Sequence, residues 1–315
     1  MYAYENYRKV KDMIEARRQK AIADAEARNL EVAARSEDIR IIDSEMRGVG
    51  LLLFKTACAG GDIDKIRKRN LFLGEERRKA LVKLGLPEDY TEVKYTCELC
   101  ADSGFVDTRM CRCFKEMLIT ENIKSSGMGS LIEKQSFENF NLDFYKNNKD
   151  NYARMKNNLT DAKKFAEDFG KGVKTLVFIG STGTGKTHLS TAIAKTVIEK
   201  GYEVLYDSAQ NIVAAFEADR FKSGYGRPYE PKADKYLECD LLILDDLGTE
   251  FVNQFTVSCL YNLINTRQNK GLSTLISTNL DYNELTSKYQ DRIFSRLVGH
   301  DSKVLVFVGQ DRRLG

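Results

Sequence analysis

The sequence predicts an α/β protein with a parallel sheet sandwiched by helices, preceded by a helical region that carries a cysteine-rich knob. Three observations lead to this prediction. Apolar runs alternate with helical patterns from residue 131 onward, and these runs are apolar at successive positions. Continuous apolar strands that alternate with helices are typical of a parallel sheet covered on both faces. A glycine-rich segment joins one such strand to a helix, and four cysteines lie close together before the first strand.

Residues 4–86 are expected to form charged helices that pack on one another. Apolar residues recur there at steps of three, four or seven, as on one side of a helix. Gly60-Gly61 ends the second of these patterns, and a further short helix is expected over residues 74–86. Because charge is high and the apolar stripe is modest, this region is expected to be marginally stable alone.

The domain boundary is placed in the segment 124–130, whose sequence Lys-Ser-Ser-Gly-Met-Gly-Ser is typical of a linker. It divides the chain into residues 1–130 and residues 131–315. The second part opens with a helical pattern over residues 159–169. The elements expected after it are strand 175–179, helix 190–200, strand 203–206, helix 209–221, strand 241–244, helix 257–269, strand 273–277 and strand 304–308.

Composition restricts the class of protein. The chain has 49 basic and 46 acidic residues, and this weak net charge argues against a protein that coats duplex DNA by electrostatics alone. No apolar run approaches the roughly 20 residues of a membrane span. The first residues lack an apolar stretch of signal-peptide type. We therefore expect a cytoplasmic protein with no membrane partner.

The glycine-rich segment is a complete phosphate-binding loop. Glycines let the backbone curl so that successive N–H groups point at a triphosphate, at the positive end of the following helix. Lys186 is expected to reach the β- and γ-phosphates, and the Thr187 hydroxyl to bind Mg²⁺. The alternative is a strand-to-helix turn without a ligand. The candidate nucleotide-binding residues are Gly180, Ser181, Thr182, Gly183, Thr184, Gly185, Lys186, Thr187 and His188.

Polar residues end two later strands of the predicted sheet. The run Leu241–Leu244 is followed by Asp245 and Asp246, which would reach the carboxyl edge where open α/β sheets bind ligands. Asp245 is expected to hold Mg²⁺, and Asp246 to orient or deprotonate the attacking water. Asn279 ends the strand that begins at Ser273 and could contact the γ-phosphate, although Asn is also an ordinary turn residue.

Two arginines lie four residues apart in a segment of helical character. Arg292 and Arg296 would share one helix face. They could make ordinary surface salt bridges. Alternatively, one of them could reach the γ-phosphate held by a neighbouring subunit, a contact that raises hydrolysis rates.

Four of the seven cysteines lie within one short segment. Cys97, Cys100, Cys111 and Cys113 form two close pairs, as the ligands of a structural Zn²⁺ ion do. A redox role for the first pair is the alternative, but such motifs open a helix within a βαβ unit. The remaining cysteines have apolar neighbours and are expected to be core residues; they are Cys58, Cys239 and Cys259.

In this order and spacing the motifs resemble those of AAA+ ATPases of the initiator and helicase-loader branch. More closely, the chain resembles the bacterial DnaC/DnaI-type replicative helicase loaders, which share an ATPase core with the IstB transposition helpers. Gly185-Lys186-Thr187-His188-Leu189 is typical of that group, as is Ser136-Phe137-Glu138-Asn139-Phe140. The resemblance covers residues 131–315, and the helical region with a cysteine-rich knob is similar to that of the Gram-positive loaders.

The resemblance implies that Lys186, Thr187, Asp245 and Asp246 bind and process Mg·ATP. It implies that Asn279 acts as sensor 1, that Arg296 is the arginine finger, and that residues 136–140 lie near the adenine. Most AAA+ proteins have Glu where Asp246 stands, and the shorter acid suits slow, switch-like hydrolysis. No helical lid is expected after the last strand, and Arg312 or Arg313 could substitute for sensor 2.

The function implied is that of a helicase loader. Its N-terminal region would bind the replicative hexameric helicase, and its self-associating ATPase domain would bind single-stranded DNA. Residues 216–231 contain basic and aromatic side chains suited to such DNA, namely Arg220, Lys222, Tyr225 and Arg227, or they form a solvated loop. The alternatives are a transposition helper on duplex DNA, a small-molecule kinase and a scaffold that binds ATP without hydrolysing it.

Overall fold

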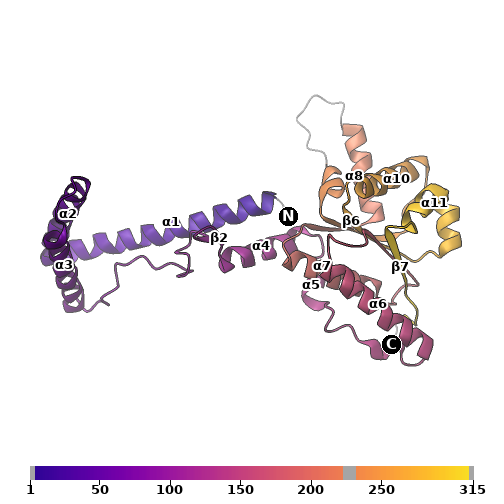
Figure 1. The fold of residues 1–315 in the computed structure, drawn as a ribbon, viewed down its shortest axis with the longest axis horizontal. Helices are drawn as coiled ribbons and strands as arrows, with labels where there is room; N and C mark the ends of the chain where they lie inside the picture. The colour runs from indigo at the N-terminus through magenta and orange to yellow at the C-terminus, as the bar shows by residue number, and fades with distance from the viewer. Residues whose placement is uncertain (1–3, 223–231, 312–315) are drawn as a thin grey trace. The chain divides into compact units, whose positions relative to one another are not determined.

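The computed structural model describes residues 4–222 and 232–311 (Figure 1). The chain divides into two compact units, Lys9–Lys115 and a second unit of Glu116–Gly315 with Met1–Arg8, and each is described by itself. The boundary expected in the segment 124–130 stays a prediction. Within the described residues, no helix has the length and apolar character that crossing a membrane requires.

The first unit consists of long helices followed by a small knob. Helix α1 (Tyr4–Arg35) is followed by α2 (Glu37–Cys58) and α3 (Asp64–Lys83), which form a hairpin (Figure 1). Ser36 caps α2, because its hydroxyl accepts a hydrogen bond from the Ile39 N–H at 3.3 Å. The core beneath the hairpin is small and is made of Val32, Ile39, Ala80 and Leu81. Helices were predicted here, but Gly74 lies within α3 and does not begin a helix.

The knob joins this unit to the second one along the chain. Its strands β1 (Phe105–Val106) and β2 (Arg109–Met110) are antiparallel, and α4 (Arg112–Ser125) follows directly. The last of the four clustered cysteines, Cys113, therefore lies in the first turn of α4.

The second unit is built on a five-stranded sheet, which confirms the predicted parallel architecture. The strand order is β4-β5-β6-β3-β7, and every neighbouring pair is parallel. The strands are β3 (Thr175–Ile179), β4 (Val204–Ser208), β5 (Leu241–Leu247), β6 (Ser273–Thr278) and β7 (Ser302–Val306). In β3, Leu176 and Phe178 face one core cluster while Val177 and Ile179 face another. Both faces of the sheet are thus buried, as the continuous apolar runs predicted.

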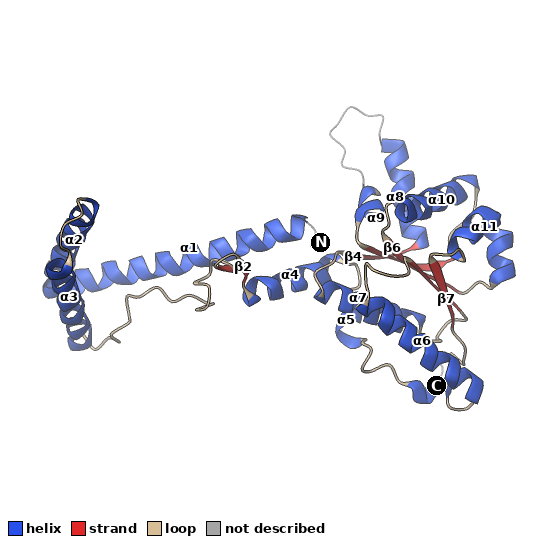
Figure 2. Ribbon diagram, in the orientation of Figure 1, coloured by secondary structure: helices blue, strands red, loops and turns tan. Residues whose placement is uncertain are grey.

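Helices cover both faces of this sheet (Figure 2). The first face carries α5 (Leu131–Lys134), the 3₁₀ helix η1 (Leu142–Tyr145), α6 (Lys149–Glu167) and α7 (Lys186–Glu199). The second face carries α8 (Ala209–Lys222), α9 (Asp234–Glu238), α10 (Gln254–Asn269) and α11 (Tyr282–Leu297). Strand β7 begins two residues before the predicted position and ends at Val306.

Candidate nucleotide-binding and metal sites

A cavity of about 560 Å³ opens at the carboxyl edge of the sheet. It brings together the phosphate loop, the two aspartates of β5 and the amide that follows β6, as the sequence predicts. Leu131, Gln135 and Tyr206 also face it, and sequence reasoning missed all three. The lining consists of Leu131, Gln135, Thr182, Gly183, Gly185, Lys186, Thr187, His188, Tyr206, Asp245, Asp246 and Asn279.

The phosphate loop curls where the sequence places it, between the end of β3 and the start of α7. Gly180 has φ +157°, and a Cβ there would lie 2.4 Å from the Phe307 carbonyl oxygen. Gly185 is the N-cap of α7, and its φ of +97° is a conformation that residues with a side chain rarely adopt. Thr184 is buried, and its hydroxyl donates to the Ser181 carbonyl at 2.7 Å. The loop therefore ends at a helix N-terminus, where free N–H groups bind anions.

The Lys186 ammonium lies inside this loop and is almost fully buried. Its Nζ donates to the carbonyl oxygens of Gly180 at 2.6 Å and Ser181 at 2.9 Å. It also donates to Asn279 Oδ1 at 2.7 Å, which links the loop to the end of β6. A cation held at a helix N-terminus is suited to bind the charged oxygens of a triphosphate.

A bulge in β5 directs both aspartates to the cavity. Successive side chains of a regular strand point to opposite faces, but the β5–β6 register shifts between Leu244 and Leu247. Asp246 has φ +54°, and its N–H donates to Ser277 Oγ at 3.1 Å. Bulges and left-handed residues of this kind are frequent next to active sites. Asp245 is buried, whereas Asp246 is exposed to the cavity.

Two hydroxyl groups hold the Asp245 carboxylate. Tyr206 on β4 donates to Oδ2, and Ser277 on β6 donates to Oδ1. Burial raises the pKa of the Tyr206 hydroxyl, and the hydrogen bond to Asp245 raises it further, so the hydroxyl remains a donor. The three residues come from three adjacent strands, which fixes the carboxylate at the edge of the cavity.

The cavity fits a magnesium nucleotide. Lys186 would bind phosphate oxygens, and Thr187 and Asp245 offer the hydroxyl and carboxylate oxygens that Mg²⁺ prefers. Gln135 also lines this cavity, and no donor among the described residues reaches its buried Oε1.

The segment Ser136–Phe140 lies against the start of α7, beside the phosphate loop. His188 Nε2 is 2.9 Å from both the Ser136 carbonyl oxygen and Asn139 Oδ1. The Phe140 ring meets the His188 ring edge-on, with centroids 5.2 Å apart. Tyr145 donates its hydroxyl to the Thr184 carbonyl at 2.8 Å. The placement of this segment near an adenine stays a prediction.

The structure does not bring Arg296 to the nucleotide cavity of its own chain. Its guanidinium lies 5.1 Å from the centroid of the Tyr261 ring and 3.3 Å from Gln268 Oε1. With Arg292 it faces a second cavity of about 560 Å³, between the ends of α10 and α11. Arg292 is exposed, one turn before Arg296. An action on a neighbouring subunit stays a prediction.

Several candidate residues lie at or beyond the limits of the described chain. Arg220 lies in α8, and its guanidinium is 5.4 Å from the centroid of the Phe255 ring. Lys222 is the last residue of α8. Tyr225, Arg227, Arg312 and Arg313 lie outside the described residues.

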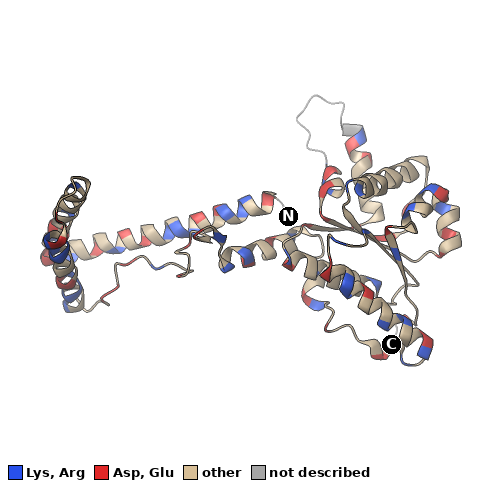
Figure 3. Ribbon diagram, viewed as in Figure 1, with Lys and Arg blue, Asp and Glu red and all other residues tan. Residues whose placement is uncertain are grey.

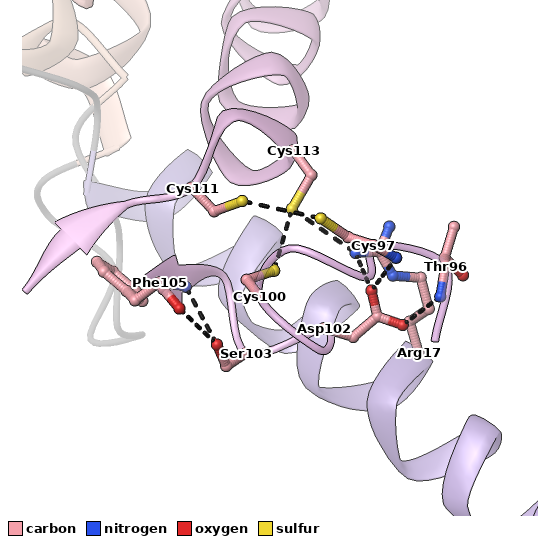
Figure 4. Close-up of polar contacts among 9 residues, drawn as sticks. All are labelled: Arg17, Thr96, Cys97, Cys100, Asp102, Ser103, Phe105, Cys111 and Cys113. Atoms are coloured by element: carbon pink, nitrogen blue, oxygen red, sulfur yellow. Dashed lines mark hydrogen bonds and ion pairs between the residues drawn. The ribbon is translucent and has the colours of Figure 1, made fainter. Parts of the chain in front are cut away.

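The four clustered cysteines converge on one point in the first unit (Figure 4). Their sulfur atoms all lie within 4.8 Å of one another. Cys97 Sγ and Cys111 Sγ are 3.8 Å apart, and Cys100 Sγ and Cys113 Sγ are 3.6 Å apart. Four sulfurs bound tetrahedrally to zinc at about 2.3 Å would lie about 3.8 Å apart. The cluster therefore fits a closed zinc site.

Asp102 organises the turn that carries the first pair of cysteines (Figure 4). Its carboxylate is fully buried and accepts the N–H groups of Thr96 and Cys97, each at 2.9 Å. Arg17 of α1 forms an ion pair with it at 2.7 Å. Burial would raise the pKa of the Cys100 thiol, but hydrogen bonds from the Gly104 main chain and the other cysteines lower it to about 7.

The three remaining cysteines differ in burial. Cys239 and Cys259 are buried, as expected. Cys58 is exposed, so its assignment to a core was wrong. It ends α2, where the apolar neighbours that suggested burial, Leu51, Leu52 and Phe54, are themselves exposed.

The chain is similar to proteins of known families. The IstB-like ATP binding protein family matches residues 123–314, more than half of the chain. The replicative helicase loader DnaC of Escherichia coli strain K12 is 24% identical over 193 residues, which are 61% of this chain and 75% of that protein. The uncharacterized protein YdaV of the same strain is 26% identical over 183 residues, which are 58% of this chain and 69% of that protein.

Solved structures also align with the chain. A crystal structure of the DnaC helicase loader aligns with a TM-score of 0.45 and 25% identity, covering 55% of this chain and 98% of that chain. A crystal structure of DnaI aligns with a TM-score of 0.45 and 23% identity, covering 59% and 95%. Through the family match, which spans the phosphate loop, both aspartates and Asn279, the chain belongs to the IstB-like ATP-binding protein family.

Proposed function

We propose that this protein is an ATP-dependent loader of a replicative DNA helicase. One observation carries the proposal: a single cavity gathers Lys186, Thr187, Asp245, Asp246 and Asn279 in a chain whose curated relatives include helicase loaders. In this proposal the N-terminal region binds the helicase, the ATPase domain binds single-stranded DNA, and slow hydrolysis switches the complex from one state to the next.

The hydrolysis step would depend on charge and alignment. Lys186 and the loop N–H groups bind the phosphate oxygens, and Thr187 and Asp245 hold Mg²⁺. The bound Mg²⁺ supplies neutralisation of the charge that develops on the phosphates. Asp246, exposed to the cavity, accepts a proton from the attacking water or orients it. Asn279 would hold the γ-phosphate or the water once a triphosphate has displaced it from Lys186.

The helical hairpin of the first unit is the proposed helicase-binding surface. Its exposed large apolar side chains lie on both helices and include Leu51, Leu52 and Phe54 on α2 and Leu71 and Phe72 on α3. On α1, acidic and basic residues are interspersed along the helix (Figure 3), and its exposed large apolar side chains include Met13 and Leu30. Exposed apolar side chains gathered on one hairpin are typical of protein–protein contact sites.

The test is capture of a purified bacterial replicative helicase hexamer by the full chain. We expect a stable complex, and we expect the double variant Leu51→Ser/Phe54→Ser to lose it. Leu30→Ser is the matched control, because Leu30 is 74% exposed on α1 and lies outside the hairpin. Failure of the unaltered chain to bind helicases would reject the loader function. Equal loss with Leu30→Ser would reject the assignment to the hairpin.

A transposition helper is the second candidate, because the matching family is described as IstB-like. Such a protein would assemble on duplex DNA in an ATP-dependent manner. Electron microscopy of the chain with ATP and duplex DNA separates the two functions. Filaments on duplex DNA without helicase capture would favour the transposition helper.

A further inference from the structure

Tyr206 connects two regions of the second unit through its main chain and its side chain. Its N–H donates to the Ser126 carbonyl at 2.7 Å. Its hydroxyl donates to the Asp245 carboxylate, and its ring faces the nucleotide cavity. Strand β4 is an edge strand of the sheet, so the turn at Ser126 and Gly127 occupies the main-chain position that a further strand would take.

The turn at residues 126–127 is tightly constrained. Ser126 is fully buried, and its hydroxyl donates to the Ile123 carbonyl at 2.7 Å and accepts the Met128 N–H at 3.3 Å. Gly127 has φ +83°, and a Cβ there would lie 2.5 Å from the Tyr206 carbonyl oxygen. The turn therefore contacts both main-chain polar groups of Tyr206, and only glycine allows so close an approach.

The side chain of Tyr206 limits the freedom of Asp245. A carboxylate that accepts one hydroxyl on each oxygen has its rotamer and its direction fixed, which lowers the entropy cost of binding a cation. Ser277 supplies one of these hydroxyls from β6, and Tyr206 supplies the other from β4. Removal of the tyrosine hydroxyl would leave Asp245 held from one side only.

We propose that Tyr206 is a positioning residue for the magnesium-binding carboxylate of Asp245, and that the turn at Ser126 and Gly127 sets its position. The proposal rests on the proposed function only in that the cavity binds Mg·ATP. It implies a way to regulate Mg²⁺ binding, because a displacement of the turn would move the edge strand β4. The Mg²⁺ site would then change while the phosphate loop stays in place.

The experiment measures the Mg²⁺ concentration that half-saturates ATP binding and ATP hydrolysis. Tyr206→Phe keeps the ring and removes the hydroxyl, and we expect this concentration to rise about 10-fold. At saturating Mg²⁺ the KM for ATP and the kcat should return close to those of the unaltered protein. Tyr236→Phe is the matched control. The Tyr236 hydroxyl donates at 2.6 Å to Asp207, which follows Tyr206 on β4. Neither Tyr236 nor Asp207 lines the nucleotide cavity.

A second variant tests the turn. Gly127→Ala should raise the half-saturating Mg²⁺ concentration in the unaltered protein and have little further effect in the Tyr206→Phe background, because both changes act through one hydrogen bond. If Gly127→Ala raises the half-saturating Mg²⁺ concentration equally in the unaltered and Tyr206→Phe proteins, the turn does not act through Tyr206. In that case, or if Gly127→Ala does not fold, the proposal is restricted to the side chain of Tyr206. An unchanged Mg²⁺ requirement in Tyr206→Phe, or the same shift in Tyr236→Phe, overturns it. An unaltered protein that binds no Mg·ATP overturns the proposed function itself.

Discussion

Lys186 Nζ and Asn279 Oδ1 lie 2.7 Å apart, so the phosphate loop and the end of β6 are joined by a direct hydrogen bond. With the carbonyls of Gly180 and Ser181, the amide gives this ammonium three neutral oxygen acceptors. A triphosphate would replace them with charged oxygens, and charge-assisted hydrogen bonds are roughly twice as strong as neutral ones. Nucleotide binding would thus release Asn279 to face the γ-phosphate.

Lys186→Ala is expected to abolish binding of ATP, because it removes the one buried ammonium that lines the described cavity. Loss of the charge should raise the Kd at least about 100-fold, since hydrogen bonds to charged groups contribute about 1.5–3 kcal/mol each. Isothermal titration calorimetry in the presence of Mg²⁺ measures the Kd for ATP. Lys200→Ala is the control, since Lys200 also donates to main-chain carbonyls but lies at the other end of α7. Undiminished affinity in Lys186→Ala would refute the assignment of the cavity.

Asp246→Asn is expected to bind ATP normally and to lose turnover. Asn tolerates the left-handed backbone at this position, so the bulge should persist. Loss of the base should slow single-turnover hydrolysis about 100-fold or more. Asp234→Asn removes the same charge from an exposed position on α9 and should hydrolyse ATP at the normal rate. Normal turnover in Asp246→Asn would move the role of base to another group.

Arg296→Ala should lower hydrolysis only where subunits adjoin. The expected loss is about 1000-fold in assembled protein, and the monomer should be unaffected. Because the variant also loses contacts with Tyr261, a modest fall in thermal stability is expected in both states. Hydrolysis measured across a series of protein concentrations tests this. Arg292→Ala, one turn earlier and exposed, shows whether the effect belongs to Arg296 alone. Equal losses in a strictly monomeric preparation would contradict a role in trans.

Thiol titration should count the cysteines that bind zinc. Burial raises the pKa of Cys239 to about 11 and that of Cys259 to about 12. A raised thiol pKa means less thiolate at a given pH, about one part in a thousand or less at pH 8. In the zinc-loaded protein we therefore expect Cys58 to react first with a disulfide reagent, and four further thiols to react after chelation.

Chelation should disorder residues 95–115 and abolish helicase capture, because the metal would hold together the two turns that carry the four cysteines. Hydrogen exchange would report the disorder, and calorimetry should show that ATP affinity is retained. Cys58→Ser removes the fast thiol and serves as the control for the count. A chelator that exposes no new thiols would refute the zinc site, and a parallel loss of ATP affinity would refute the predicted domain division.

Sequence reasoning found the sheet because its three central strands, β5, β6 and β3, are buried on both faces. Leu241 to Leu244 are all buried, so the run had to be apolar at each position. The phosphate loop was identifiable because its glycines adopt conformations closed to other residues. Helix α3, by contrast, continues through Gly74. Arg69 and Arg77 of α3 pair with Glu45 and Asp43 of α2, so contacts with α2 flank this glycine, which alone costs a helix roughly 1 kcal/mol.

Tyr206 and Ser277 could not be found in this way. Each contacts Asp245 from a different strand, and the sequence does not state that β4 and β6 flank β5. Cys58 also shows that neighbours along the sequence do not determine which residues pack together in space. Its apolar neighbours predicted burial, but the small core of the hairpin includes Ile39, Ala80 and Leu81, whereas Leu51, Leu52 and Phe54 are exposed.

The bulge in β5 means that one extra residue in this strand decides whether the cavity receives the second aspartate. Leu244 and Leu247 pack into the same core cluster although regular alternation would set residues three apart on opposite faces. Deleting Asp246 would give these leucines the even spacing of an ordinary strand. We expect the shortened protein to keep its core and fold, yet to be hydrolytically silent. Loss of this one residue would therefore leave the proposed ATPase with nucleotide binding alone.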